Sequence, residues 1–381
     1  MHLVIYTNIL TPYRKYFFDL VYRECEKNGD EFHVLVMAET EPGRSWKYCD
    51  LKANYTILLN SRTITRGDAN FHFNSNLYEM LEKLKPTVLV CAGGYNCPGV
   101  WKAAKLKKRL KYKCFFWSET HLKEVKESGR LKKTIREMVR RMTYRQFDGF
   151  WYAGMLSRQL CEKYALADAK YYFLPNLVEE EKFAQKPSRS QRIANKTILD
   201  IKADKIVFLC PARLTPVKGI LEFLSVIANS HEKSKAVFLI AGNGELRGEI
   251  ETQAMKNQID LRLLGEKTQE DLINLYAAAD VFLLPSLSDP NPLSCIEALW
   301  SSLPLLISEH CGNYPEVVRQ GENGYVFSYQ EPEKVIDMFD KIVESDESWR
   351  ISAGELSYEI AERTYSSQVA VSRILDEMRE T

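Results

Sequence analysis

Short runs of apolar residues recur along the chain, separated by segments in which apolar positions follow a helical spacing. The runs are rich in Val, Ile, Leu and aromatic residues, a composition that favours β-strands. Continuous apolar strands that alternate with helices are typical of parallel sheets buried on both faces. The predicted strands are 2–7, 32–37, 55–59, 87–93, 114–117, 150–153, 171–175, 206–212, 236–242, 261–265, 281–286 and 304–308.

The alternation stops and restarts around residues 178–204, which are polar and largely lack apolar runs, so we interpret them as a linker region. A chain of 381 residues is also long for one domain. We therefore predict an α/β fold with two doubly wound, Rossmann-like domains, residues 1–180 and 181–360, that face each other across a cleft. Ligands of such folds bind beyond the carboxyl ends of the strands. The last segment, 361–381, is expected to be a helix that packs back toward the N-terminal domain.

The composition, with 45% hydrophobic residues and mixed charges, is that of a globular protein with large cores. Nine cysteines include no Cys-x-x-Cys pair, and several of them, such as Cys91, Cys114 and Cys210, lie within apolar runs. This usage predicts reduced, buried thiols and a cytoplasmic protein. Since no stretch of about 18 apolar residues is present, we expect no membrane-spanning helix.

The net charge of +1 hides a strongly basic segment, because residues 102–145 contain sixteen Lys or Arg against four Glu. An apolar stripe at helical spacing in this segment consists of Leu131, Ile135, Met138 and Met142. Such a helix either covers its own core with its charges in water, or rests on an anionic membrane surface. A peripheral membrane association through residues 102–145 is thus one of two interpretations. Nucleic-acid binding is not expected, because no recognised binding module accompanies the charge.

Two carboxylates, Asp289 and Glu297, flank the predicted first turns of a helix. Asn291 is a favourable N-cap and Pro292 suits the first helical position, so the helix should begin there. Glu297 then lies roughly 9 Å from the cap, at ~1.5 Å per residue. The unpaired amides and the positive end of the helix fall between the two acids. This order fits a nucleotide sugar, in which a diphosphate separates two hydroxyl-bearing rings.

Two basic residues suited to bind a diphosphate, Arg213 and Lys218, follow a predicted buried strand. Arginine offers phosphate oxygens a planar fork, and lysine offers them a compact charge. Gly242 and Gly244 end the next strand and would let the backbone approach a ligand closely. A single Gly-x-Gly is a weak signal. With the basic pair and the two acids on one doubly wound domain, it indicates a nucleotide-sugar site.

The second half of the chain resembles the retaining glycosyltransferases of family 4, which have the two-domain GT-B fold. Asp289 and Glu297 look like the acid-x7-acid motif of that family, and Arg213 and Lys218 look like its phosphate-binding pair. Also similar are the stretches "LLGEKTQEDLINLYAAADVFLLPS" and "CGNYPEVVRQGENGYVF". The resemblance is specific over residues 205–327 and weaker over the first half, where "SETHL" and "FLPNLV" contribute to it.

This resemblance implies transfer of a sugar from a nucleotide diphosphate sugar, with UDP-sugar favoured, to an acceptor hydroxyl with retention of configuration. It implies no metal and no cofactor apart from the nucleotide sugar as co-substrate. The implied acceptor is a glycan or a lipid-linked glycan, in the assembly of bacterial cell-surface polysaccharide or glycolipid. The implied catalytic residues are Arg213, Lys218, Asp289 and His121. The implied donor-binding residues are Gly242, Gly244, Gly265, Lys267, Asn291, Pro292, Leu293 and Glu297.

Several residues after predicted strands of the first half are acceptor-side candidates, with turn or packing roles as the alternative. They are Tyr13, Arg14, Gly94 and Tyr95. The sequence also departs from the family pattern. Asp289 stands where the family usually has Glu, and Pro292, which has no N–H, stands where it usually has Gly. The loop "TNILTPYR" lacks the glycine pair common there.

Three other functions are compatible with parts of this pattern. A glycoside hydrolase could use Asp289 and Glu297 as acid and base, but it would have no use for Arg213 and Lys218. A nucleotide-sugar epimerase of the same fold is a closer alternative. A non-catalytic sugar-nucleotide sensor or scaffold would retain binding without turnover. Release of free nucleotide only when an acceptor is supplied would distinguish a transferase from all three.

Overall fold

The computed structural model of the protein describes residues 1–42, 47–66, 69–121 and 130–381, with only the backbone described at 66, 69 and 130–132. The predictions that concern Leu122 and the side chain of Leu131 lie outside this part of the chain. The described residues form two compact units. The N-terminal unit contains residues 1–121, 130–175 and 367–381, and the C-terminal unit contains residues 176–366.

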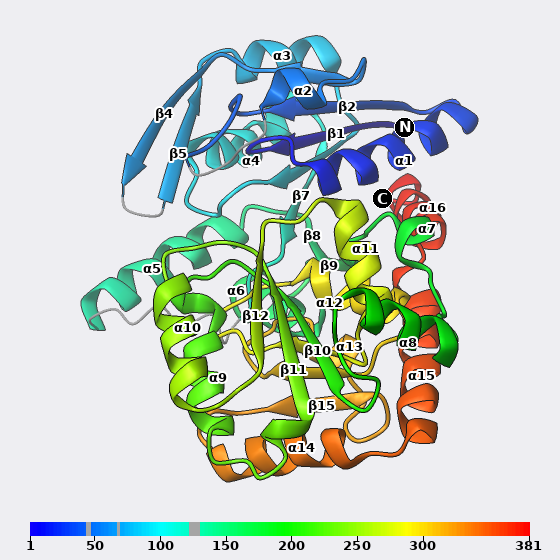
Figure 1. The fold of residues 1–381 in the computed structure, drawn as a ribbon. Coiled ribbons are helices and arrows are strands. Elements are labelled where there is room, and N and C mark those ends of the chain that lie inside the picture. The colour runs from blue at the N-terminus through cyan, green and yellow to red at the C-terminus, as the bar shows by residue number, and fades with distance from the viewer. Residues whose placement is uncertain (43–46, 67–68, 122–129) are drawn as a thin grey trace. The chain divides into compact units, whose positions relative to one another are not determined.

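A seven-stranded parallel sheet forms the centre of the N-terminal unit (Figure 1). Its strands are β1 (His2–Thr7), β2 (Glu31–Val36), β3 (Thr56–Leu58), β6 (Val88–Ala92), β7 (Lys113–Ser118), β8 (Gly149–Tyr152) and β9 (Lys170–Phe173). Their order is β3-β2-β1-β6-β7-β8-β9, so the chain returns to the other side of β1 after β3. The helices of this unit are α1 (Pro12–Lys27), α2 (Tyr48–Leu51), α3 (Leu77–Leu84), α4 (Pro98–Leu110), α5 (Arg130–Tyr144), α6 (Met155–Tyr164) and α16 (Ser367–Arg379).

An antiparallel hairpin of β4 (Ser61–Arg66) and β5 (Ala69–Asn74) is inserted in this unit and is not among the predicted strands. Polar side chains attach it to the sheet. The Tyr6 hydroxyl donates to Asn74 Oδ1 (2.7 Å), and Asn74 Nδ2 donates to the Met37 carbonyl (2.8 Å). His72, which is fully buried, lies 2.9 Å from the Glu41 carboxylate. Because polar contacts carry the hairpin, no apolar run announces it in the sequence.

The C-terminal unit is built on a six-stranded parallel sheet. Its strands are β10 (Ile206–Pro211), β11 (Ala236–Ala241), β12 (Leu261–Gly265), β13 (Val281–Leu284), β14 (Leu305–Ser308) and β15 (Gly324–Phe327), the last of which was not predicted. Their order is β12-β11-β10-β13-β14-β15. Its helices are α7 (Glu180–Phe183), α8 (Arg189–Ile198), α9 (Ile220–Ile227), α10 (Arg247–Lys256), α11 (Gln269–Ala278), α12 (Leu293–Trp300), α13 (Tyr314–Val317), α14 (Pro332–Glu344) and α15 (Glu347–Tyr365), with 3₁₀ turns at Pro216–Lys218 and Lys233–Lys235.

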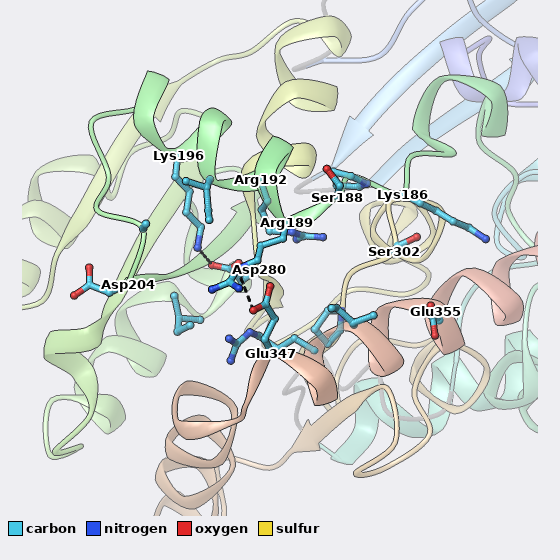
Figure 2. Close-up of a pocket in the computed structure, with 17 residues that line it drawn as sticks. Lys186, Ser188, Arg189, Arg192, Lys196, Asp204, Asp280, Ser302, Glu347 and Glu355 are labelled. Carbon is cyan, nitrogen blue, oxygen red and sulfur yellow. Dashed lines mark ion pairs between the residues drawn. The ribbon is translucent and has the colours of Figure 1, made fainter.

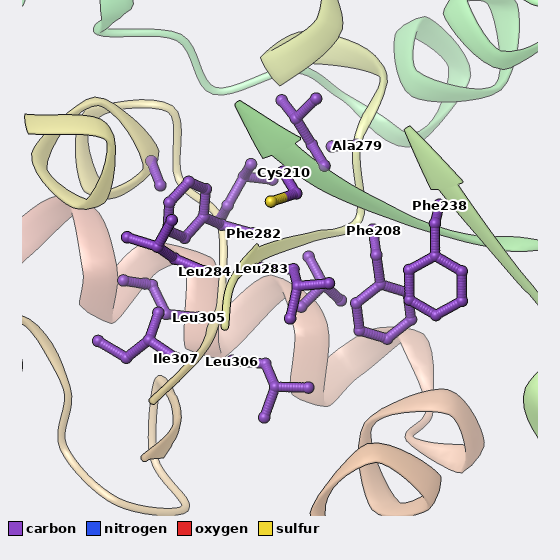
Figure 3. Close-up of a cluster of buried hydrophobic side chains, with 14 of the residues drawn as sticks. Phe208, Cys210, Phe238, Ala279, Phe282, Leu283, Leu284, Leu305, Leu306 and Ile307 are labelled. Carbon is purple, nitrogen blue, oxygen red and sulfur yellow. The ribbon is translucent and has the colours of Figure 1, made fainter. Parts of the chain in front are cut away.

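Helices cover both faces of this sheet (Figure 1). On one face α9 contacts α10 and α14, and on the other α8 contacts α11 and α12 contacts α15. Between these layers the strand side chains form a continuous apolar core, in which the rings of Phe208 and Phe238 stack with centroids 5.3 Å apart (Figure 3). Removal of such a ring typically costs ~3–5 kcal/mol. The predicted α/β class with two doubly wound sheets is confirmed.

The segments at the two ends of the C-terminal unit are helices that pack on other elements. Residues 178–204, interpreted from sequence as a linker, instead form α7 and α8, which contact α12 and α11 respectively. At the other end α15 belongs to the C-terminal unit, and α16 belongs to the N-terminal unit, where it packs on α1. Arg379 of α16 also forms an ion pair with Asp30 (2.8 Å). The chain therefore begins and ends in the same unit.

Candidate functional site

The candidate residues of the C-terminal unit gather where the central strands of its sheet end. β10 lies between β11 and β13, so the loops that follow these three strands are neighbours. The Leu214 amide donates to the Asn243 carbonyl (2.9 Å), and the Leu287 amide donates to the Val217 carbonyl (2.8 Å). These bonds join the loop after β10 to the loops on either side of it. In doubly wound folds, ligands bind at this edge of the sheet, beside the strand where the order reverses.

The predicted glycines lie at this edge, but they approach neighbouring backbone. The Gly242 amide donates to the Gly265 carbonyl (2.8 Å), which joins the ends of β11 and β12. Gly242 has φ of +150°, and a β-carbon there would lie 2.2 Å from the Ala212 carbonyl oxygen. A β-carbon at Gly244 would come equally close to the Leu214 carbonyl oxygen. The absence of these side chains lets the loops after β10 and β11 pack together.

Arg213 and Lys218 follow β10 but have different surroundings. Arg213 is exposed, and within the described residues its guanidinium makes no hydrogen bond or ion pair. Lys218 is partly buried, and its Nζ lies 2.5 Å from Asp289 Oδ2. The structure thus joins as an ion pair two residues that sequence reasoning assigns to different parts of a ligand, Lys218 to the diphosphate and Asp289 to the sugar.

Backbone contacts hold Asp289 in position after β13. Its amide donates to the His310 carbonyl (3.1 Å), and its own carbonyl accepts from the Gly312 amide (2.8 Å). His310 and Gly312 belong to the loop after β14, and Lys218 belongs to the loop after β10. The loops that follow β10, β13 and β14 therefore meet at Asp289. His310 was not among the predicted residues. Nothing in a lone histidine after a short apolar run distinguishes a residue whose carbonyl holds the backbone of Asp289 from an ordinary loop residue.

The helix after β13 starts one residue later than predicted. α12 begins at Leu293 with Pro292 as its N-cap, not with Asn291 as cap and Pro292 in the first turn. The cause is tertiary: Asn176 Nδ2 donates to the Asn291 carbonyl (3.3 Å), and Asn313 Nδ2 donates to the Pro292 carbonyl (3.0 Å). Among the described residues no side chain caps the start of α12. The Cys295 amide donates to the Pro292 carbonyl (3.3 Å), so the amides of Leu293 and Ser294 are the ones available to an anionic ligand, as at other helix N-termini.

Glu297, in the second turn of α12, is half-buried, and its carboxylate accepts a hydrogen bond from a tyrosine. The Tyr276 hydroxyl of α11 donates to Glu297 Oε2 (2.8 Å). Burial raises the pKa of Glu297 to about 7, and the hydrogen bond from Tyr276 only partly opposes this shift. A carboxylate held this way is often functional. Tyr276 was not predicted, since "NLYAAAD" is equally typical of a buried helix.

The remaining donor-side candidate, Lys267, is exposed in the loop between β12 and α11. Within the described residues, no group of His, Cys, Asp and Glu side chains has the arrangement of a metal site. Nor does any helix of the same residues combine the length and the apolar character needed to cross a bilayer.

The candidates of the N-terminal unit follow the adjacent strands β1, β6 and β7. Arg14 donates to Thr7 Oγ1 (3.1 Å) and to Glu119 (3.1 Å), and it lies over the Trp117 ring, so its contacts are those of a packing residue. His121 is buried just after β7. Tyr13, next to Arg14, is half-buried and Gly94 is exposed. Tyr95 carries the Arg140 guanidinium over its ring at 4.4 Å.

Known proteins share parts of this sequence. Residues 191–357 match the model of the family described as glycosyl transferases group 1. The Escherichia coli protein UDP-Gal:alpha-D-GlcNAc-diphosphoundecaprenol alpha-1,3-galactosyltransferase is 33% identical over 161 residues, 41% of each chain. The putative glycosyltransferase EpsF of Bacillus subtilis is 33% identical over 143 residues, 37% of this chain and 36% of that protein. The alignments thus span well under two thirds of these relatives.

Solved structures match the chain over its whole length. Anabaena HepE in complex with UDP superimposes with a TM-score of 0.78 at 13% identity, and the match covers 100% of both chains. Sucrose-phosphate synthase of Thermosynechococcus elongatus gives 0.75 at 14% identity, over 100% of this chain and 98% of that one. The protein therefore has the GT-B fold of glycosyltransferase structures. Residues 191–357, less than half of the chain, share the sequence pattern of the group 1 glycosyl transferases, in line with the resemblance to glycosyltransferase family 4.

Gly242→Ala should destabilise the C-terminal unit by about 2–4 kcal/mol, because it combines backbone strain with a clash against Ala212. Gly248→Ala is the matched control: this glycine lies in α10, and beyond its chain neighbours and the backbone of its own helix no described atom lies within 4 Å of the added carbon. The control should gain about 0.5–1 kcal/mol from its higher helix propensity. Urea unfolding of both variants measures the difference, and equal stabilities would show that close packing at Gly242 is unimportant.

Proposed function

We propose that the protein is a retaining glycosyltransferase that moves a sugar from a UDP-sugar to an acceptor hydroxyl. The observation that carries this proposal is the order of groups along one edge of the C-terminal sheet. Arg213 and Lys218 follow β10, Asp289 follows β13, and the uncapped start of α12 precedes Glu297. Two cations and helix amides between two carboxylates match a diphosphate between two hydroxyl-bearing rings.

The reaction needs negative charge to be stabilised on the departing diphosphate as the anomeric bond breaks. Arg213, with an uncommitted guanidinium, and the first amides of α12 are suited to this task. Lys218 is held by Asp289 at 2.5 Å. A bound diphosphate would compete for the Lys218 ammonium, and Asp289 would then accept hydrogen bonds from sugar hydroxyls. The ion pair thus keeps both side chains oriented toward the same point until the donor separates them.

Glu297 is assigned to the ribose, and the uracil edge to the backbone near Gly265 and Lys267. Support for UDP comes from relatives: the E. coli galactosyltransferase is named for UDP-Gal, and HepE has been solved with UDP-glucose. The name of the E. coli protein also gives its acceptor as a sugar linked to diphosphoundecaprenol. Another relative acts in amylovoran biosynthesis. We therefore propose a glycan or lipid-linked glycan acceptor, in assembly of a cell-surface polysaccharide or glycolipid.

The alternatives differ in what happens to the donor. Incubation with UDP-, GDP-, ADP- and dTDP-sugars, with thermal unfolding as the first readout, identifies the nucleotide. A ligand at 100 times its dissociation constant should add ~2.7 kcal/mol of stability. Release of free nucleotide only when a glycan acceptor is added supports a transferase. Interconversion of the donor sugar without acceptor would show an epimerase, and binding without any turnover would show a sensor or scaffold.

Helix α5 supports a peripheral membrane location for the acceptor. Its apolar stripe does not cover a core, because Ile135, Met138 and Met142 are 49%, 55% and 63% exposed. Lys133 and Arg141 of the same helix are exposed as well. An exposed apolar stripe beside basic side chains fits the surface of an anionic membrane. We propose that α5 brings the enzyme to a membrane that carries its acceptor.

Arg213→Ala and Lys218→Ala should each lower turnover roughly ten- to a thousandfold, because each removes a charge that stabilises the departing diphosphate. Steady-state rates with saturating donor and acceptor measure the effect. Arg319→Ala, which truncates another exposed arginine of the same unit, is the control and should retain normal turnover. Near-normal rates in the first two variants would remove both residues from the site.

The affinity for UDP should fall as the pH drops below 7, because ribose hydroxyls bind the charged form of Glu297, whose pKa is about 7. Glu297→Gln should weaken UDP binding at pH 8 by about 1–2 kcal/mol. The difference between this variant and the unmodified protein should shrink toward pH 6, and the comparison cancels the titration of UDP itself. Asp289→Asn should bind UDP normally while sugar transfer falls. Equal losses of UDP affinity in both variants, measured by calorimetry, would contradict the two assignments.

The protein should sediment with anionic vesicles but not with neutral ones, and molar salt should release it, since the Debye length is then only ~3 Å. Replacement of Lys133, Arg136 and Arg141 by Gln should abolish binding without changing UDP affinity. Arg140 is spared because it packs on Tyr95. A control variant with the exposed lysines 27, 52 and 83 replaced by Gln should still sediment. Binding that is equal for both vesicle types would leave α5 as a solvated helix.

A further inference from the structure

A second cavity lies at the opposite edge of the C-terminal sheet, where the strands begin. Its volume is about 630 Å³, within the range of small-molecule sites. Ile206, at the start of β10, and Asp280 and Pro304, which precede β13 and β14, line its base. Helices α8 and α15 supply its walls (Figure 2). The cavity is therefore separated from the candidate site by the length of the strands.

The base of the cavity contains a buried ion pair whose groups are already satisfied. Lys196 Nζ lies 2.6 Å from Asp280 Oδ2, and both side chains are over 90% buried. Asp280 Oδ2 also accepts from the Val207 amide (2.8 Å), and Lys196 donates to the Lys205 carbonyl (2.9 Å). These bonds anchor α8 to the beginning of the sheet. The pair is structural and leaves little charge for a ligand.

The other carboxylate at the centre of the cavity is also paired. Glu347 Oε2 lies 3.1 Å from Arg189 Nε, and Figure 2 shows this pair next to Asp280. In the same view Lys186, Asp204 and Glu355 lie at the rim, away from the central group. The two carboxylates of the centre are thus each matched by their own cation.

Two further arginines, Arg192 and Arg350, line the cavity and form no salt bridge with a carboxylate among the described residues. Arg192 donates Nη1 to the Ala279 carbonyl, and Arg350 donates Nη1 to the Ser345 carbonyl. A guanidinium has five N–H donors, so each arginine keeps most of them uncommitted. Burial lowers the pKa of Arg192; the carboxylates of Asp280 and Glu347 oppose this shift, and the charge of Arg350 adds to it. Because Asp280 and Glu347 are already paired with Lys196 and Arg189, the cavity keeps an excess of positive charge, which favours an anionic ligand.

We propose that this cavity binds a small phosphorylated metabolite, whose phosphate is held between Arg192 and Arg350. A phosphate monoester is a dianion above its second pKa of about 6, so it would neutralise both guanidinium groups, and each can bind its oxygens through two N–H groups. Ile193, Pro304 and Ile351 line the same cavity and would contact the rest of the metabolite. This site is distinct from the donor site, so the inference does not depend on the proposed transfer reaction.

The first test uses inorganic phosphate and glucose 6-phosphate as probes with the full-length protein at pH 8. Both should raise the unfolding temperature saturably, relative to sodium chloride of equal ionic strength, and excess UDP should not prevent the effect. Loss of the effect in excess UDP would place the phosphate in the donor site and overturn the proposal. An unfolding temperature that does not respond to either probe would overturn it as well.

Variants then locate the bound phosphate. Arg350→Met and Arg192→Met should each weaken phosphate binding about tenfold or more, measured by calorimetry on protein whose circular dichroism is unchanged. Arg363→Met, on the exposed side of α15, is the matched control and should bind phosphate normally. If Arg192→Met fails to fold, Arg192→Lys keeps the charge and should show an intermediate loss. Unchanged phosphate affinity in Arg350→Met would contradict the assignment.

Discussion

The lateral pairing of β10 with β11 on one side and β13 on the other is the constraint on which the candidate site depends. Phe208 pairs with Phe238 in one direction and with Val281 in the other, so three strands far apart in the chain run parallel and in register. Parallel strands end at a common edge, and each following loop is delivered there. Lys218 and Asp289, which are 71 residues apart in sequence, meet for this reason alone.

The charged side chains at that edge differ in whether they have a partner of opposite charge. The Lys218–Asp289 pair is close and partly buried, so its two charges compensate each other. Glu297 accepts a hydrogen bond from the Tyr276 hydroxyl and forms no ion pair with the residues that the structure describes, and burial raises its pKa. Arg213 is exposed and uncommitted among the described residues. A half-buried carboxylate without a cation costs stability, which is more readily understood at a ligand site than in a structural role.

The opposite edge of the same sheet shows how burial sorts charged groups into structural and available ones. Lys196 and Asp280 pair with each other and with backbone groups at the start of β10, so removal of either one would leave the other charge buried and unpaired. Arg192 and Arg350 are tied only by single Nη1 atoms to neighbouring groups. The sheet thus has charged side chains at both of its edges. At each edge the ion-paired residues join segments of the fold, whereas the arginines without an ion pair among the described residues are suited to bind a ligand.

Much of this protein can be predicted from the sequence alone, because its strands are continuous apolar runs that a parallel sheet buries on both faces. All twelve predicted runs overlap a strand, and Arg213, Lys218, Asp289 and Glu297 stand out because they lie in the segments that follow two of these runs. The hairpin β4–β5, the start of α12 and the partners Tyr276 and His310 could not be predicted. They depend on hydrogen bonds from distant residues, such as Asn313 to Pro292, and only the folded sheet brings those residues together. Local patterns record what each segment buries, whereas tertiary structure decides which polar groups meet.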